Sequence, residues 1–139
     1  MANAPFEHGV RVYYEDTDAG GIVYYANYLK YAERARTEIL RSIGMDQSDL
    51  LRDRHIAFAV RACNAEYLKP AILDDALVVR TRVADMTGAR LAMHQDVCRG
   101  DDVLVELDVK LVCVNTETGA PTRLPLELRE RLGRPAAAE

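Results

Sequence analysis

The residues of this chain that could do chemistry gather between positions 13 and 25, in the sequence YYEDTDAGGIVYY. Asp18 stands there in a short acidic turn, just ahead of a long helical pattern. A helix N-terminus presents free backbone N–H groups and the positive end of the helix dipole. A carboxylate beside such donors combines a base or nucleophile with a site for developing negative charge. This combination favours acyl-transfer chemistry.

Each of these residues also has a purely structural reading. Asp18 can serve as an N-terminal cap, a common use of Asp in this position. Gly20 and Gly21 lack Cβ atoms, so they either let the backbone approach a ligand or simply permit the turn. The residue pattern alone leaves both readings open.

A long amphipathic helix is the strongest secondary-structure prediction. From Ala26 onward, apolar residues recur at steps of three and four, and Gly44 stands where a left-handed C′ residue is expected. The apolar stripe consists of Leu29, Ala32, Ala35, Ile39, Leu40 and Ile43. Its small alanines would let another backbone come close, as a sheet wrapped around the helix requires.

Strand patterns stand on both sides of this helix in the chain. Residues 8–15 form a first strand, and residues 45–55 form a polar linker with a short helical turn at SDLLRD. Four further strands are predicted over 55–69, 76–86, 90–99 and 103–115. Short turns imply antiparallel pairing, and the helix must be buried against the sheet, which indicates an α+β fold. One helix leaves a sheet face and its edges uncovered, so we expect self-association.

We expect one domain over residues 1–139. Its core covers about 8–116, and a C-terminal tail carries a short helix over about 125–133, because Pro125 can begin a helix.

Composition narrows the function. The net charge of −4 argues against non-specific nucleic-acid binding. The N-terminus has no signal-peptide pattern, and no apolar run is long enough to span a membrane. Cys63, Cys98 and Cys113 lie in apolar strand-like runs, so we interpret them as buried free thiols of a reducing cytoplasm.

No metal or cofactor is predicted. DTDAGG lacks the remaining ligands of an EF-hand loop, with Asn27 where its closing Glu would stand, and the histidines have no ligand spacing. The sequence contains no Walker A or G-x-G-x-x-G motif that would bind phosphate. It also lacks the G-x-S-x-G elbow, which excludes an α/β-hydrolase route to thioester cleavage.

The segment YEDTDAGGIVYYANYLKYAERAR (14–36) resembles the signature of hot-dog-fold acyl-CoA thioesterases of the 4-hydroxybenzoyl-CoA thioesterase type, most nearly the Tol–Pal-associated branch. The stretches AFAVRACNAEYLKPAILDDALVVRTRV and VCVNTETGAPTRLP extend the resemblance over residues 8 to about 125. It implies an antiparallel sheet of five to six strands wrapped around one long central helix. It also implies a homo-oligomer, with sheets joined edge to edge in dimers that often pair into a homotetramer, and a peripheral association with the cell envelope.

The resemblance assigns roles to individual residues. Asp18 corresponds to the catalytic carboxylate, the backbone N–H of Tyr25 to the group that polarises the thioester carbonyl, and Tyr14 to an active-site tyrosine. Many members of the branch carry a histidine where this chain has Tyr25, so the weight of the chemistry shifts to Asp18. Asp18 would attack the thioester to give a mixed anhydride, or deprotonate an attacking water; both routes stay open.

Two further residues are candidates for substrate binding. Asn27 would form hydrogen bonds near the helix start, or be an ordinary polar residue there. Arg61 is one of several strand arginines that would bind the phosphates of coenzyme A, or lie on a solvated face.

The leading hypothesis is an acyl-CoA thioester hydrolase that releases a carboxylic acid and free CoA. A hydroxyacyl-thioester dehydratase ranks lower, because that chemistry usually pairs a His with a carboxylate and residues 13–36 contain no His. The alternative from another class is a non-catalytic acyl-thioester-binding or envelope-complex assembly module. The acyl group, the thioester carrier and the choice between dimer and tetramer are left open by the sequence.

Overall fold

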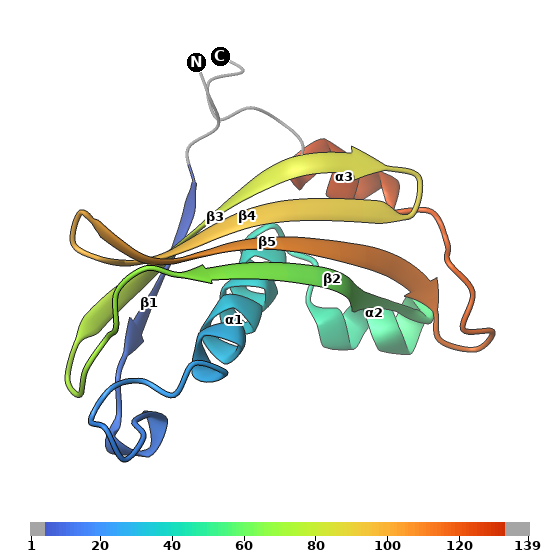
Figure 1. The fold of residues 1–139 in the computed structure, drawn as a ribbon. Coiled ribbons are helices and arrows are strands. Elements are labelled where there is room, and N and C mark those ends of the chain that lie inside the picture. Colours follow the sequence, from blue (N-terminus) through green and yellow to red (C-terminus); the bar gives the residue numbers. More distant parts are fainter. Residues whose placement is uncertain (1–4, 133–139) are drawn as a thin grey trace.

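The structure is a computed structural model that describes residues 5–132. One antiparallel sheet has the strand order β1-β3-β4-β5-β2 and curves around a single long helix, α1 (Figure 1). The strands are β1 (Phe6–Arg11), β2 (Ile56–Tyr67), β3 (Ala76–Thr87), β4 (Arg90–Arg99) and β5 (Asp102–Asn115). The predicted α+β fold, an antiparallel sheet of five strands around a central helix, is confirmed.

Helix α1 (Asn27–Ser42) packs its small residues against β1, β3 and β4. Ala32 and Ala35 have no exposed surface, and the Ala32 carbonyl accepts a hydrogen bond from Gln95 Nε2 of β4 at 3.0 Å. Gly44 follows the helix at φ +78, the left-handed conformation that the sequence predicted. Leu29 was predicted to belong to the buried stripe, but its side chain is 42% exposed.

The first strand is shorter than predicted, and the chain turns earlier. β1 ends at Arg11, and residues Tyr14–Asp16 form a 3₁₀ turn, η1, where the sequence predicted strand to residue 15. The Asp16 carboxylate accepts a hydrogen bond from the Tyr13 N–H at 2.8 Å. This local bond offers the backbone an alternative to the sheet, which explains why the aromatic strand pattern fails here.

Two short helices complete the fold. The SDLLRD segment lies in α2 (Gln47–Arg54), a longer helix than the single turn predicted, and it ends where His55 takes a left-handed φ of 54. In the tail, α3 (Leu126–Leu132) buries Leu128; residue 133 of the predicted tail helix lies outside the described residues. Within 5–132, no helix is both long and apolar enough to cross a membrane.

Strand β2 lies at one edge of the sheet, hydrogen-bonded only to β5 within the described chain. Most of its residues are exposed, including Cys63. The prediction of three buried thiols is therefore wrong for Cys63, since an edge strand has a neighbouring strand on one side only. It is correct for Cys98 and Cys113.

Candidate active site

Asp18 lies near the tip of a short hairpin, here called the Asp18 hairpin, which runs from Asp16 to Tyr24. The Tyr24 N–H donates to the Asp16 carbonyl at 2.9 Å and closes the base of the hairpin. The Asp18 N–H donates to the Ile22 carbonyl at 2.8 Å. The carboxylate itself is exposed and accepts one hydrogen bond, from the Gly20 N–H to Oδ1 at 2.8 Å.

The two glycines of this hairpin serve different purposes. A Cβ atom on Gly20 would lie 3.2 Å from Asp18 Oδ1, so a side chain at this position would press on the carboxylate. Gly21 has φ +83 and no neighbour within 4 Å of a built Cβ, so it is needed for the turn conformation alone. Gly20 therefore holds Asp18 in place, and Gly21 allows the chain to reverse.

The segment between the hairpin and α1 leaves two backbone N–H groups, those of Tyr25 and Ala26, without an acceptor among the described residues. The helix begins at Asn27, with Ala26 as its N-cap, and the Asn27 N–H donates to the Tyr24 carbonyl at 2.8 Å. Among the described residues, none accepts a hydrogen bond from the Tyr25 N–H. The Asp18 hairpin and this free donor thus lie at the same end of α1.

An open apolar pocket of about 240 Å³ lies beside this end of α1. Three aromatic rings form much of its wall: the Tyr25 and Tyr67 ring centroids are 5.9 Å apart, and those of Tyr28 and Tyr67 are 5.8 Å apart. Its remaining lining residues are Ile22, Val23, Leu68, Lys69 and Pro70. The pocket offers an apolar ligand a surface next to the free Tyr25 N–H.

Two other predicted residues also lie at this end of the molecule. Asn27 is 8% exposed, and its Nδ2 donates to the Asp16 carbonyl at 2.8 Å. It therefore ties α1 to the hairpin base. Tyr14 is 81% exposed in η1, and its hydroxyl forms no hydrogen bond with Asp18 in the described structure.

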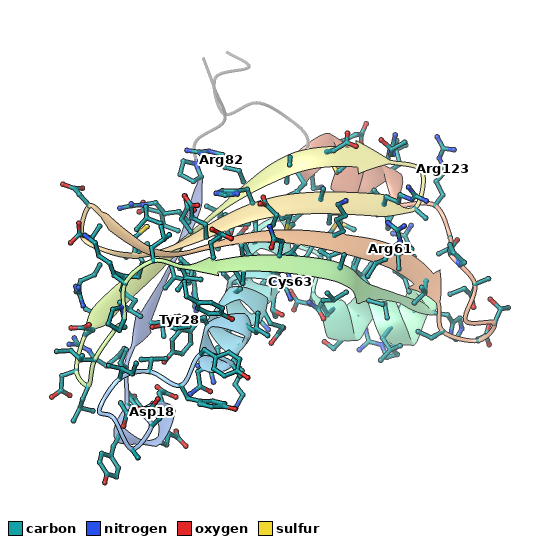
Figure 2. All side chains as sticks on the ribbon, viewed as in Figure 1. Asp18, Tyr28, Arg61, Cys63, Arg82 and Arg123 are labelled. Atoms are coloured by element: carbon teal, nitrogen blue, oxygen red, sulfur yellow. The ribbon has the colours of Figure 1, made fainter. Side chains whose placement is uncertain are left out.

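Arg61 is not brought near Asp18 within one chain. Figure 2 shows Asp18 below α1 and Arg61 toward the opposite end of β2. Arg61 follows Val60, where a bulge shifts the register of β2 against β5. With Arg90 and Lys110 it lines a second depression, of about 200 Å³, which also contains Asp85.

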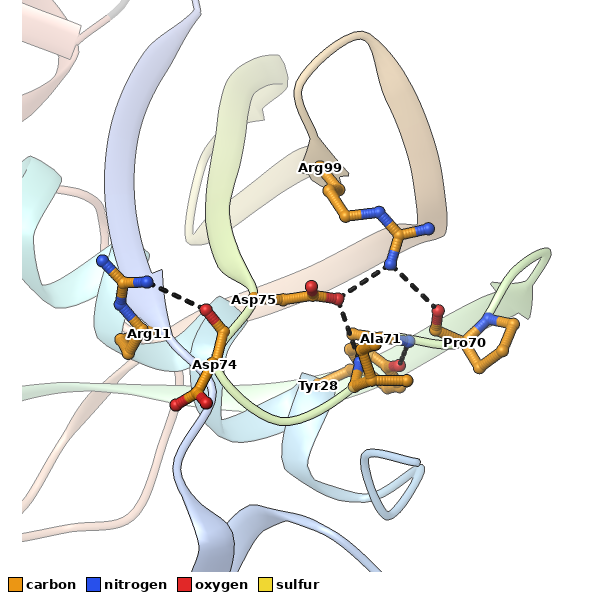
Figure 3. Close-up of polar contacts among 8 residues, drawn as sticks. Arg11, Tyr28, Pro70, Ala71, Asp74, Asp75 and Arg99 are labelled. Atoms are coloured by element: carbon orange, nitrogen blue, oxygen red, sulfur yellow. Dashed lines mark hydrogen bonds and ion pairs between the residues drawn. The ribbon is translucent and has the colours of Figure 1, made fainter. Parts of the chain in front are cut away.

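A network that the sequence did not predict supports the Asp18 hairpin (Figure 3). Arg99 Nη1, at the end of β4, lies 2.7 Å from Asp75 Oδ2, and the same oxygen accepts the Ile72 N–H at 2.9 Å. The buried Tyr28 hydroxyl accepts the Ala71 N–H at 3.0 Å. These bonds fix the loop over residues 70–75.

This loop in turn holds the hairpin. The Val23 N–H donates to the Ala71 carbonyl at 2.9 Å, and Ile22 forms an antiparallel bridge with Ile72. Burial tends to raise the pKa of Asp75, but the bonds from Ile72 and Arg99 outweigh it and leave the pKa below its ordinary value. The sequence shows Asp75 as a turn residue and Arg99 as a hairpin-end arginine, and no spacing signal pairs them.

Comparison with known proteins identifies the fold family. The family model described as the thioesterase-like superfamily matches residues 12–132. This chain belongs to the thioesterase-like superfamily.

Relatives of this thioesterase-like protein are similar to it in sequence over nearly its whole length. The acyl-CoA thioesterase YbgC of Haemophilus influenzae is 42% identical over 129 residues, covering 93% of this chain and 95% of that protein. The acyl-CoA thioester hydrolase YbgC of Escherichia coli O6:H1 is 45% identical over 126 residues, covering 90% and 93%. The prediction of a thioesterase enzyme is confirmed.

A solved structure shows the same fold. A probable thioesterase from Bartonella henselae has a TM-score of 0.84 and 37% identity, covering 88% of this chain and 100% of that one. The predicted resemblance to hot-dog thioesterases is therefore confirmed. The association with a Tol–Pal system stays a prediction.

Among the residues that the structure describes, no group of three His, Cys, Asp or Glu side chains is arranged to hold a metal ion.

Proposed function

We propose that this protein hydrolyses acyl-CoA thioesters, with Asp18 as general base or nucleophile and the Tyr25 N–H as the oxyanion donor. One observation carries the proposal: an exposed carboxylate and a free backbone N–H lie at the same end of α1, beside an apolar pocket. The printed names of the relatives, acyl-CoA thioesterase and acyl-CoA thioester hydrolase, support the same substrate class.

The reaction needs two groups from this chain. In the general-base route, Asp18 takes a proton from water while the hydroxide adds to the thioester carbon. The carbonyl oxygen becomes an oxyanion, which the Tyr25 N–H stabilises, and one such donor typically contributes about 3–4 kcal/mol to the transition state. The C–S bond then breaks, and the departing thiolate receives the proton from Asp18.

In the nucleophilic route, an Asp18 oxygen attacks the same carbon and the thiolate leaves. The resulting mixed anhydride is then hydrolysed by water. The exposed position of Asp18, with one oxygen engaged by Gly20 and the other free, suits either route. In a single turnover in ¹⁸O-labelled water, label in Asp18 would identify the nucleophilic route, because only opening of the anhydride at the Asp18 carbonyl places it there.

The phosphates of CoA would be bound by Arg61 together with Arg90 and Lys110. These three cations surround one depression that contains a single acid, Asp85, so the site has a net positive charge. The free edge of β2 suggests how two chains could pair. Antiparallel pairing of two β2 edges would bring the Ile56 half of one strand, which includes Arg61, beside the Tyr67 half of the other. A homodimer, or a tetramer of such dimers, would thereby present one chain's cations to its partner's Asp18.

The deciding experiment is thiol release from a panel of acyl-CoAs by the wild type and by Asp18→Asn. Asn keeps the volume but removes the charge and basicity, so we expect kcat to fall at least about a hundredfold with the fold intact. Equal activity of Asp18→Asn would overturn the assignment of Asp18. A wild type that binds but never hydrolyses acyl-CoA would favour the non-catalytic binding or assembly module.

A further inference from the structure

A pocket of about 190 Å³ lies two to three turns along α1 from the Asp18 hairpin, between α1, α2 and the sheet. Its walls are mainly apolar, with Leu40 of α1 facing Phe58 and Val60 of β2. Arg36 of α1 also lines it. An arginine in an apolar wall needs an explanation, because burying part of a charge is costly unless a partner compensates.

Arg36 is held by a neutral network. Its Nη1 donates to Gln95 Oε1 at 2.9 Å, and Gln95 has no exposed surface. Gln95 Nε2 donates in turn to the Ala32 carbonyl at 3.0 Å and to Thr81 Oγ1 at 2.9 Å. Because both the oxygen and the nitrogen of the Gln95 amide are hydrogen-bonded, the amide cannot rotate, and it fixes the orientation of the Arg36 guanidinium.

The remaining donors of Arg36 are free. Within the described residues, no carboxylate forms an ion pair with Arg36, and its Nε and Nη2 have no hydrogen-bond partner. Glu33 also lines the pocket, and its Oε2 accepts a hydrogen bond from Thr37 Oγ1. Burial lowers the pKa of Arg36, with Glu33 opposing the shift. A partly desolvated cation therefore presents unused donors at the pocket wall.

The candidate path between this pocket and the one beside Asp18 follows β2, from Val60, which lines the first pocket, to Tyr67, which lines the second. Leu29 lies on the same face of α1 as Arg36, seven residues earlier in the helix, and its side chain is 42% exposed. On β2, Tyr67 and Cys63 face the same side, because their β5 partners, Val105 and Val109, are buried in the core.

Along β2, Cys63 lies between Val60, which lines one pocket, and Tyr67, which lines the other. Figure 2 places it on β2 beside α1. Burial lowers the pKa of Arg36, and the nearby Cys63 opposes that shift; burial raises the pKa of Tyr67, and Cys63 adds to that shift. From Asn27 to Arg36 the helix axis rises by about 14 Å. The path therefore suits a medium-length chain lying along α1.

We propose that this path receives the acyl chain and that Arg36 selects substrates whose far end carries a hydrogen-bond acceptor, above all a carboxylate. The inference rests on the proposed thioester hydrolysis. An apolar chain fits the walls, whereas its polar end gains charge-assisted hydrogen bonds from the unused Arg36 donors. A methyl end would leave those donors buried without partners, and discrimination of this kind is large.

The test compares kcat/KM for acyl-CoAs from hexanoyl to dodecanoyl with the ω-hydroxy and ω-carboxy compounds of equal carbon number. We expect the wild type to prefer the ω-carboxy substrate at the best chain length, with the ω-hydroxy compound between. Arg36→Met should lose at least about tenfold on the ω-carboxy substrate and far less on the plain one. Arg34→Met is the matched control, since Arg34 lies on α1 outside this pocket, and should leave the preference unchanged.

A second variant keeps the inference testable if Arg36→Met does not fold. Val60→Phe adds volume at an exposed wall position and should abolish turnover of long chains of either kind, with butyryl-CoA still hydrolysed. Equal wild-type rates on plain and ω-carboxy substrates, or an equal loss of both in Arg36→Met, would overturn the role of Arg36. Hydrolysis of no acyl-CoA at all would instead overturn the proposed function.

Discussion

Arg99 Nη1 lies 2.7 Å from Asp75 Oδ2, and this pair ties the end of β4 to the loop that carries the Asp18 hairpin. The Asp75 side chain is 16% exposed and that of Arg99 38% exposed. The pair touches no residue of the proposed chemistry, but the loop that it anchors accepts the Val23 N–H of the hairpin at the Ala71 carbonyl and forms the bridge between Ile72 and Ile22. Arg99 and Asp75 are therefore positioning residues.

The first prediction concerns this pair. Arg99→Met should lower kcat on acyl-CoA several-fold while costing at most about 1 kcal/mol of unfolding free energy, because the pair is partly solvated. A double-mutant cycle with Asp75→Asn measures the coupling. Arg82→Met, on β3 and exposed, is the control. Additive effects of the two changes on kcat would show that the pair does not act as a unit.

The second prediction concerns the buried Tyr28 hydroxyl. Tyr28→Phe leaves the fully buried Ala71 N–H without its acceptor, so unfolding free energy should fall by about 1–3 kcal/mol. Urea denaturation measures this cost. Tyr13→Phe, which removes a hydroxyl from a ring 61% exposed, should change stability by less than about 0.5 kcal/mol. If Tyr28→Phe lost no more unfolding free energy than this control, another group would have to accept the Ala71 N–H.

The third prediction tests whether Gly20 holds the Asp18 carboxylate in the position that catalysis needs. Gly20→Ala places a methyl group 3.2 Å from Asp18 Oδ1, so kcat should fall at least about tenfold as the carboxylate shifts. Gly9→Ala, whose nearest neighbour would be 3.9 Å away, is the control for adding a methyl group. Full activity in a folded Gly20→Ala would show that the position of Oδ1 is not critical.

The fourth prediction is a pH dependence of stability. His94 Nδ1 lies 2.9 Å from Asp108 Oδ1, and Nε2 lies 2.8 Å from Asp96 Oδ1. An imidazole donates to two carboxylates only when doubly protonated. The bond to Asp108 raises the pKa of His94, aided by Asp96, although burial opposes the shift. Arg82, opposite His94 on β3, adds a like charge.

The sign follows from this raised pKa. The stabilisation is complete below the unfolded-state pKa of about 6.5 and is lost as the pH rises through the folded-state value. Unfolding free energy of the wild type should therefore decline from about pH 6 toward pH 9, and His94→Gln should remove that part of the decline. Parallel curves for the two proteins would contradict the prediction.

The architecture was predictable because its signals are local. Hydrophobic periodicity marked α1, the turn residues separated the later strands to within two residues, and Gly44 marked the helix end. The same holds for the position of Asp18 relative to the start of α1. Asp18 and the helix start are close in the chain, so their proximity follows from one hairpin.

The wrong predictions concern residues whose local sequence pattern indicates one environment, whereas the fold places them in another. Leu29 fits the apolar stripe but is exposed, because α1 packs on β1, β3 and β4 and leaves this face uncovered. Cys63 looks like a core residue, but its strand is at the sheet edge. The aromatic run near Tyr14 reads as strand, whereas Asp16 bends it into a turn.

The sequence by itself determined the elements, the turn that carries Asp18 and the family of the chain, since each depends on residues adjacent in the chain. Only the tertiary structure decided which distant residues meet. Arg99 reaches Asp75, Gln95 directs Arg36, and Arg61 lies far from Asp18 within one chain (Figure 2). The physical reason is that strand order and register, which set these contacts, are fixed by the packing of the whole core and not by any local pattern.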